Sequence, residues 1–97
     1  MARIQIDPEK LESAAGKLRE LGESLREEKG QMSTVSGNIE SAWKSQSTAA
    51  FLETMETTEN NMEQLARATD ILVRNLLSLA ETARRIEQQN SSDFLDG

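Results

Sequence analysis

Cysteine, histidine and tyrosine are absent from the 97 residues, and the chain has only one proline, five glycines and one tryptophan. Without cysteine no disulfide framework can form. Without cysteine and histidine the chain lacks the thiol nucleophile, the commonest acid–base catalyst and the usual zinc ligands. It also lacks a glycine-rich phosphate loop and a Gly-x-Ser-x-Gly turn. We therefore expect a protein that is not an enzyme and that holds no cofactor and no metal.

Basic charge and long apolar runs are also scarce. The net charge is −6 at pH 7, whereas nucleic-acid-binding proteins usually carry a basic stripe, so we expect no nucleic-acid partner. No apolar run is long enough to cross a bilayer, so we expect no stable membrane insertion. The first residues, MARIQIDPEK, lack the apolar region of a cleavable signal peptide, and we expect any export to use another route.

The residues that are abundant are typical of helices. Glu, Gln, Leu, Ala, Arg and Lys dominate, while aromatic residues make up only 3% of the chain. Such a composition favours helices and disfavours a sheet. The length fits one small domain. The sequence therefore predicts a single all-α domain over residues 1–97.

The segment IQIDPEKL marks the start of a first helix near residue 8. Asp7 can accept hydrogen bonds from the first free N–H groups, and Pro8 fits the first helical position. Two interleaved series then recur every seven residues, which predicts a helix over residues 8–42 with one packed face. The first series is Leu11, Leu18, Leu25, Met32 and Ile39, and the second is Ala14, Leu21, Glu28, Val35 and Ala42.

An apolar series restarts after the stretch SAWKSQS and alternates by four and three residues. It predicts a second helix over residues 48–89, with a turn over 43–47 and a flexible polar tail over 90–97. The members of the series are Phe51, Met55, Thr58, Met62, Leu65, Thr69, Leu72, Leu76, Leu79, Ala83 and Ile86.

So short a turn requires the two helices to run antiparallel. Folding at the turn pairs positions whose numbers sum to about 90, and it brings the two apolar series together. The expected pairs are Leu11 with Leu79, Leu18 with Leu72, Leu25 with Leu65, and Ile39 with Phe51.

Further small and apolar residues lie beside the main series on both helices. Exposed stripes of this kind usually mark an interface, so we expect two hairpins to pair through two-fold symmetry into a four-helix bundle. The alternative is that these residues only widen the contact between the helices of one chain. The dimer-interface candidates are Ala15, Gly22, Ala66, Val73, Leu77 and Ala80.

Polar residues interrupt these patterns at a few positions. Carboxylate-bridged metal sites in helical bundles also need Glu-x-x-His, so we interpret the clustered glutamates of the second helix as a solvated face. Glu28 and Thr58 stand within the apolar series, where polar residues usually set the register of packed helices. The clustered glutamates are Glu53, Glu56, Glu59 and Glu63.

With its helices, turn and charge taken together, the chain resembles the WXG family, the hundred-residue, early-secreted-antigen-like substrates of type VII secretion systems. The resemblance covers essentially the whole chain and includes the length, the acidic balance and a tryptophan at the break between the helices. The family motif is Trp-x-Gly, whereas this chain has Trp43, Lys44 and Ser45. Because a positive φ is strained for serine, we expect Ser45 to have a negative φ and to serve as a turn or cap residue.

The resemblance implies a helical hairpin that pairs with itself as a homodimer, or with a sister WXG-like protein, to form a four-helix bundle. It implies a protein secreted by Gram-positive bacteria without a cleavable signal peptide, through a type VII secretion ATPase. In this role the chain would be a virulence effector or a component of the export apparatus. The family export signal is Tyr-x-x-x-Asp/Glu, and the matching positions here are Ala83 and Glu87, so alanine replaces the tyrosine.

Two other functions remain open at the level of the sequence. One is a helical adaptor or targeting chaperone that pairs with a larger type VII-secreted toxin, which a neighbouring toxin gene would favour. The other is an amphipathic protein of the membrane surface. The second is disfavoured because the polar side of the second helix is rich in glutamate rather than in lysine and arginine.

Overall fold

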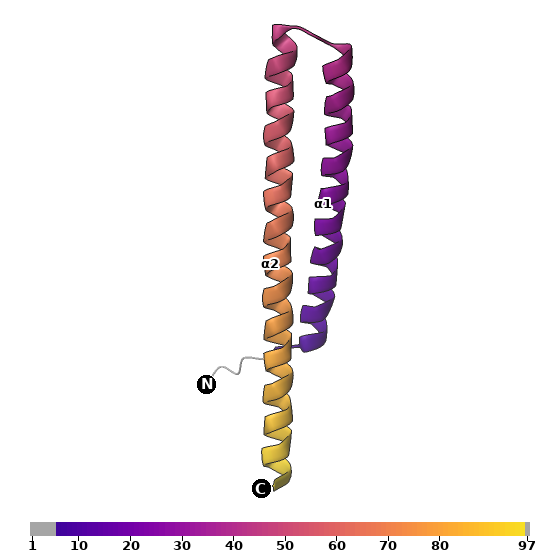
Figure 1. Cartoon of the computed structure of the whole chain (residues 1–97). Coiled ribbons are helices and arrows are strands. Elements are labelled where there is room, and N and C mark those ends of the chain that lie inside the picture. Colours follow the sequence, from indigo (N-terminus) through magenta and orange to yellow (C-terminus); the bar gives the residue numbers. More distant parts are fainter. Residues whose placement is uncertain (1–5, 97) are drawn as a thin grey trace.

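Two long antiparallel helices make up the described part of the chain in this computed structural model (Figure 1). The structure describes the backbone of residues 6–96 and the side chains of residues 6–90. Helix α1 spans Pro8–Ala42 and helix α2 spans Gln46–Asp96. The hairpin measures 78 × 23 × 13 Å, so it has two broad faces and two narrow edges. The predicted all-α hairpin is confirmed.

Helix α1 begins where the capping pattern predicts. The Asp7 carboxylate accepts hydrogen bonds from the N–H of Glu9 at 3.0 Å and the N–H of Lys10 at 3.3 Å. Pro8 occupies the first helical position, where no N–H donor is needed. The helix ends at Ala42, and the N–H of Trp43 donates to the carbonyl oxygen of Ile39 at 2.9 Å.

Ser45 caps the start of α2 through a reciprocal arrangement with Thr48. The N–H of Thr48 donates to Oγ of Ser45 at 3.4 Å, and the N–H of Ser45 donates to Oγ1 of Thr48 at 3.2 Å. This is the geometry of a capping box, with threonine in the place usually held by Glu or Gln. No residue in the described range has a positive φ, so the negative φ expected for Ser45 is confirmed.

Removing this cap gives a measurable prediction. We expect Ser45→Ala to lower the free energy of unfolding by about 1 kcal/mol, whereas Ser45→Gly costs only a few tenths because glycine is also accepted as an N-cap. Urea denaturation followed by circular dichroism measures both values. Ser47→Ala, at an exposed neighbouring serine, is the control and should be nearly neutral. Equal losses for Ser45→Ala and Ser47→Ala would contradict the assignment of the cap.

The contact between the helices is a narrow inner seam of buried and half-buried side chains. On each helix these residues recur at alternating intervals of three and four, as in a coiled coil. On α1 they are Pro8, Leu11, Ala15, Leu18, Gly22, Leu25, Lys29, Met32, Ser36 and Ile39. On α2 they are Thr48, Leu52, Met55, Glu59, Met62, Ala66, Thr69, Val73, Leu76, Ala80 and Ala83.

The two helices approach each other closely at Gly22. A Cβ atom built at this glycine would lie 2.6 Å from Oγ1 of Thr69, which is too close for any side chain. Thr69 is itself buried, and its hydroxyl donates to the carbonyl oxygen of Ala66 at 2.6 Å. Small side chains therefore let the helices pack closely, with α1 and α2 in the antiparallel register that the sequence predicts to within a few residues.

Helix α2 is longer than the sequence predicts at both ends. It begins at Gln46 because Ser45 caps it, and it continues to Asp96 instead of giving way to a tail near residue 90. The stretch QQNSSDFLD contains neither glycine nor proline, so nothing in it stops a helix. The last turns of α2 therefore extend past the start of α1 (Figure 1).

Candidate functional site

Five of the six predicted dimer-interface residues are buried inside the single hairpin. The exposed fractions of Ala15, Ala66 and Ala80 are 2% or less, and Gly22 and Val73 are also buried. These residues belong to the inner seam, so the prediction that they face a second chain is wrong. The physical reason is that the small residues allow the close approach of α1 and α2. The sixth candidate, Leu77, is exposed but lies away from the seam.

Most of the exposed large apolar side chains lie on one broad face, here called the apolar face. Except at Ala42 and Ile86 they precede seam residues by one position, and in an antiparallel pair such positions point to the same side. The apolar face consists of Ala14, Leu21, Glu28, Val35 and Ala42 on α1, and of Phe51, Thr58, Leu65, Leu72, Leu79 and Ile86 on α2. The sequence pattern had placed these residues in the contact between the helices, and this expectation is corrected.

Charged residues are nearly missing from the apolar face. The positions that border it are mostly uncharged: Ser24, Gln31 and Asn38 on α1, and Thr54, Asn61, Ala68, Asn75 and Thr82 on α2. Lys10 and Lys17 complete the border on α1. Glu28 is therefore the one acidic residue on the face or its border among the described residues. Leu65 and Leu72 are 53% and 48% exposed at its centre.

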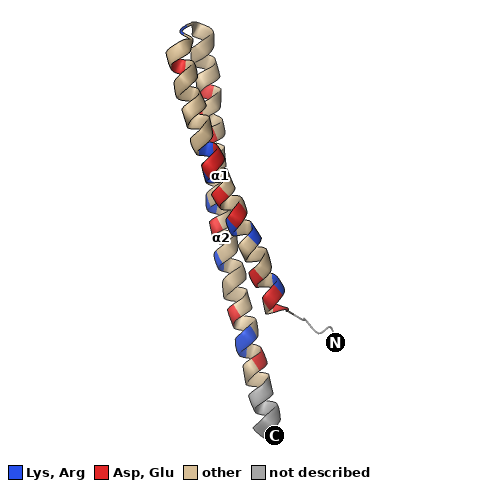
Figure 2. Ribbon diagram, turned by 90° about the vertical axis from the view of Figure 1, so that its right-hand side faces the viewer, with Lys and Arg blue, Asp and Glu red and all other residues tan. Residues whose placement is uncertain are grey.

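The opposite broad face carries ion pairs between the helices. Arg26 Nη2 lies 2.7 Å from Asp70 Oδ2, and Arg84 forms a second pair with Glu12. Glu63 is shared between Lys29 across the seam and Arg67 on its own helix. Figure 2 shows the acidic and basic residues along both helices, with few of them near the turn. Each exposed pair of this kind adds little to the free energy of unfolding. Together the pairs favour the packing in which these sides of α1 and α2 lie on the same broad face.

These ion pairs shift the ionisation of their members. The pKa of Asp70 is lowered, chiefly by its hydrogen bond with Arg26, and the pKa of Arg26 is raised by the same bond. The pKa of Glu63 is lowered, first by its hydrogen bond with Arg67 and then by Lys29. A lowered carboxyl pKa contributes stability above the unfolded-state pKa, and this is lost as the pH falls through the folded-state pKa. The contribution of these ion pairs to the free energy of unfolding is therefore lost in acid, below about pH 4.

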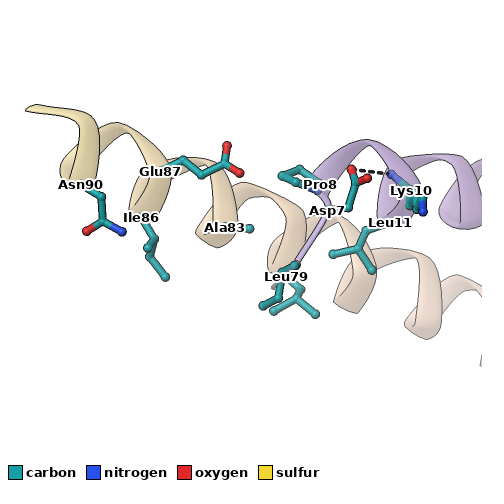
Figure 3. A pocket seen from close by; sticks show the side chains of 10 residues that line it. Asp7, Pro8, Lys10, Leu11, Leu79, Ala83, Ile86, Glu87 and Asn90 are labelled. Atoms are coloured by element: carbon teal, nitrogen blue, oxygen red, sulfur yellow. Dashed lines mark hydrogen bonds between the residues drawn. The ribbon is translucent and has the colours of Figure 1, made fainter. Parts of the chain in front are cut away.

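The open end of the hairpin contains a groove of about 920 Å³ between the start of α1 and the last turns of α2 (Figure 3). Ala83 lies in this groove beneath the first turn of α1 and is only 6% exposed, whereas Glu87 is exposed. The apolar lining consists of Ile6, Pro8, Leu11, Leu79, Ala83 and Ile86, and the polar lining of Asp7, Lys10, Glu87 and Asn90.

The turn end presents an exposed aromatic pair. The ring centroids of Trp43 and Phe51 are 6.1 Å apart, with the rings tilted by 50°. The two side chains are 44% and 43% exposed, so each ring covers the other only in part. Trp43, the first residue after α1, therefore packs against Phe51 in the second turn of α2. Because Phe51 begins the row of large residues on α2, the aromatic pair extends the apolar face to the turn.

Within the described residues no group of His, Cys, Asp or Glu side chains could hold a metal ion. Glu59 and Glu63, expected on a solvated face, are half-buried, Glu59 in the seam and Glu63 beside it, and Ser36 donates to Glu59 Oε1 at 3.5 Å. No helix in the described range is long and apolar enough to span a bilayer.

Comparison with known proteins identifies a family for this chain. A family model described as WXG100, proteins of 100 residues with WXG, matches residues 3–88. The matched range contains all of α1, the turn with Trp43, and α2 up to the residue after Glu87. No curated protein and no solved structure matches the chain.

Proposed function

The chain belongs to the WXG100 family, the small helical proteins associated with type VII secretion, and from this premise we propose that it is exported as a folded dimer. In this proposal the protein acts without catalysis, as an effector or as a component of the export apparatus. Its partner is a second hairpin of the same kind, and the dimer is delivered to the secretion ATPase.

The observation that carries the proposal is the apolar face. The hairpin alternates small and large residues in its own seam and leaves a second row with many large apolar side chains exposed. Monomeric soluble proteins rarely expose so long an apolar surface, and a second hairpin laid on it gives a four-helix bundle with these residues inside. The ion-paired face then stays in water, which suits a protein that moves between compartments in its folded state.

The candidate export determinant is the exposed Glu87, four residues after Ala83 on α2. Because Ala83 is covered by the start of α1, its side chain is poorly placed for recognition, and Glu87 would carry most of the signal on this chain. The last turns of α2 project beyond α1, which leaves them accessible to a receptor (Figure 1).

We expect deletion of residues 87–97 to abolish export. The inner seam ends at Ala83, so the shortened chain should keep its hairpin, which circular dichroism would confirm. The measurement is the amount of protein in culture supernatant and in cells of a native host. The expected result is accumulation in the cells and loss from the supernatant.

Two point variants sharpen the experiment. Glu87→Ala should reduce export, while Glu20→Ala removes an equally exposed carboxylate from α1 and should leave export unchanged. Undiminished export of the truncated chain would contradict the role of Glu87. Undiminished export from a host without the type VII ATPase would contradict the proposed function as a whole.

A further inference from the structure

We propose that Met32, Met55 and Met62 form an oxidation site whose sulfoxides loosen the turn-side half of the hairpin and leave the other half packed. The modifying reagent is a peroxide, and the modified atoms are the three thioether sulfurs. The effect belongs to the single hairpin and requires neither export nor a second copy.

The inner seam is packed unevenly along its length. In the half toward the open end, buried residues recur on both helices, from Pro8 to Gly22 on α1 and from Ala66 to Ala83 on α2. Between Gly22 and Ala66, a stretch that includes the turn, Thr48 is the only buried residue. The turn-side half therefore packs less tightly, and it is the half that opens at the lower cost in free energy.

All methionines among the described residues lie in this turn-side half. Met32, Met55 and Met62 occupy positions in the seam, and each side chain is half-buried, so a small oxidant can reach it from solvent. The chain has no cysteine, so methionine is the residue on which mild peroxide oxidation falls. The other half of the seam has leucine, alanine and valine at the matching positions and offers no such target.

Two of the three methionines lie at the same level of the seam. Ser36 Oγ is 3.5 Å from Glu59 Oε1, which aligns these two residues across the helices. Met32 precedes Ser36 by four residues and Met62 follows Glu59 by three, so in an antiparallel pair the two methionines lie at about the same level. Oxidation of both would put two sulfoxide oxygens into one layer of the seam.

Met55 shares the hydroxyl group of Ser36 with Glu59. Ser36 Oγ lies 3.4 Å from Met55 Sδ and 3.5 Å from Glu59 Oε1. A serine hydroxyl has one proton to donate, so it serves only one of these acceptors at a time. A sulfoxide oxygen at Met55 would either take this proton from Glu59 or stay without a donor. In both cases a half-buried polar oxygen lacks its hydrogen bond, which is unfavourable while the seam stays closed.

The reaction is a two-electron oxidation of sulfur by hydrogen peroxide. The sulfur lone pair attacks one peroxide oxygen and the O–O bond breaks. The proton of the transferred oxygen passes to the departing hydroxide, which leaves as water. The product side chain is polar instead of apolar, and sulfoxide reductases specific for each of the two epimers return it to the thioether. The change is therefore reversible.

Peroxide treatment followed by hydrogen exchange tests the site. The full chain is treated at low concentration, so that association through the apolar face is minimal, until the intact mass shows one added oxygen for each methionine. Amide exchange is then measured by mass spectrometry. We expect exchange over residues 30–62 to become about tenfold faster or more, because the sulfoxides disfavour the closed seam. Exchange over residues 11–25 and 66–83 should change little, and the two reductases should restore the original rates.

The matched control replaces Met32, Met55 and Met62 with leucine, a swap of similar volume that packed seams tolerate. This variant keeps Met1, so an effect of peroxide through that residue would persist in it. We expect peroxide to leave its exchange rates unchanged.

Three results would overturn the proposal. One is sulfoxide at the three positions without faster exchange, and another is equally faster exchange in both halves of the hairpin. The third is failure of peroxide to oxidise these methionines in the diluted protein while it oxidises free methionine in the same solution. None of these results bears on export, which the deletion of residues 87–97 tests separately.

Discussion

Replacing both Leu65 and Leu72 with glutamate is expected to convert the dimer to a monomer while leaving the hairpin helical. Both side chains are about half exposed in the single chain, so the charges remain in water when the hairpin folds alone. In the proposed dimer the same positions would lie at the centre of the buried face, and symmetry would place four unpaired carboxylates there. We expect the dissociation constant to rise about a thousandfold or more, since uncompensated buried charges are strongly unfavourable.

The measurement is the molar mass by sedimentation equilibrium, with circular dichroism on the same samples. Ile71→Glu is the matched control, because Ile71 is 50% exposed on α2 but points away from the apolar face. The control should retain the dimer. A dimer that tolerates Leu65→Glu together with Leu72→Glu, or that is equally sensitive at Ile71, would show that association uses a different surface.

Gly22→Val is expected to lower the free energy of unfolding by about 2 to 3 kcal/mol, which is a usual cost of overpacking. The new side chain would have to occupy the space that Thr69 Oγ1 now fills 2.6 Å from the ideal Cβ position. Accommodating it requires α1 to move away from α2 or Thr69 to give up its hydrogen bond to Ala66. Urea denaturation at one fixed protein concentration measures the loss, since the proposed dimer would make the stability depend on concentration.

Gly30→Val provides the control for helix propensity. Gly30 is exposed, and a Cβ built there meets no other atom within 4 Å, so the same substitution should be neutral or slightly stabilising. The difference between the two variants isolates the close approach of the helices. Equal effects at Gly22 and Gly30 would mean that the small residues of the seam do not set the distance between α1 and α2.

The sequence was sufficient to predict the hairpin and most of its boundaries. Asp7 and Pro8 have one strong interpretation as a helix start, and the structure begins α1 there. The break at Trp43 and the antiparallel register also follow from patterns within a single chain. Helix α2 exceeds its predicted end because a polar stretch without glycine or proline can stay helical without an apolar pattern in its sequence.

The sequence was not sufficient to decide which row of residues faces the other helix. The row that contains Leu21 and the row that contains Gly22 are both spaced by seven and both border the row of Leu18 and Leu25. Hydrophobic periodicity predicts that the row with the larger side chains faces the other helix. Close packing of two long helices instead favours the row with the smaller side chains at the contact. A seam within a chain and a seam between chains have the same period, so only the packed structure distinguishes them.

The most direct test of the apolar face as a binding surface for a second copy is the solution mass of the purified chain. Sedimentation equilibrium at micromolar concentration and neutral pH should give about 22 kDa, twice the chain mass of 10.8 kDa. The mass should return to that of one chain for the variant with glutamate at positions 65 and 72. A mass of 10.8 kDa for the unmodified chain at every concentration would contradict the account.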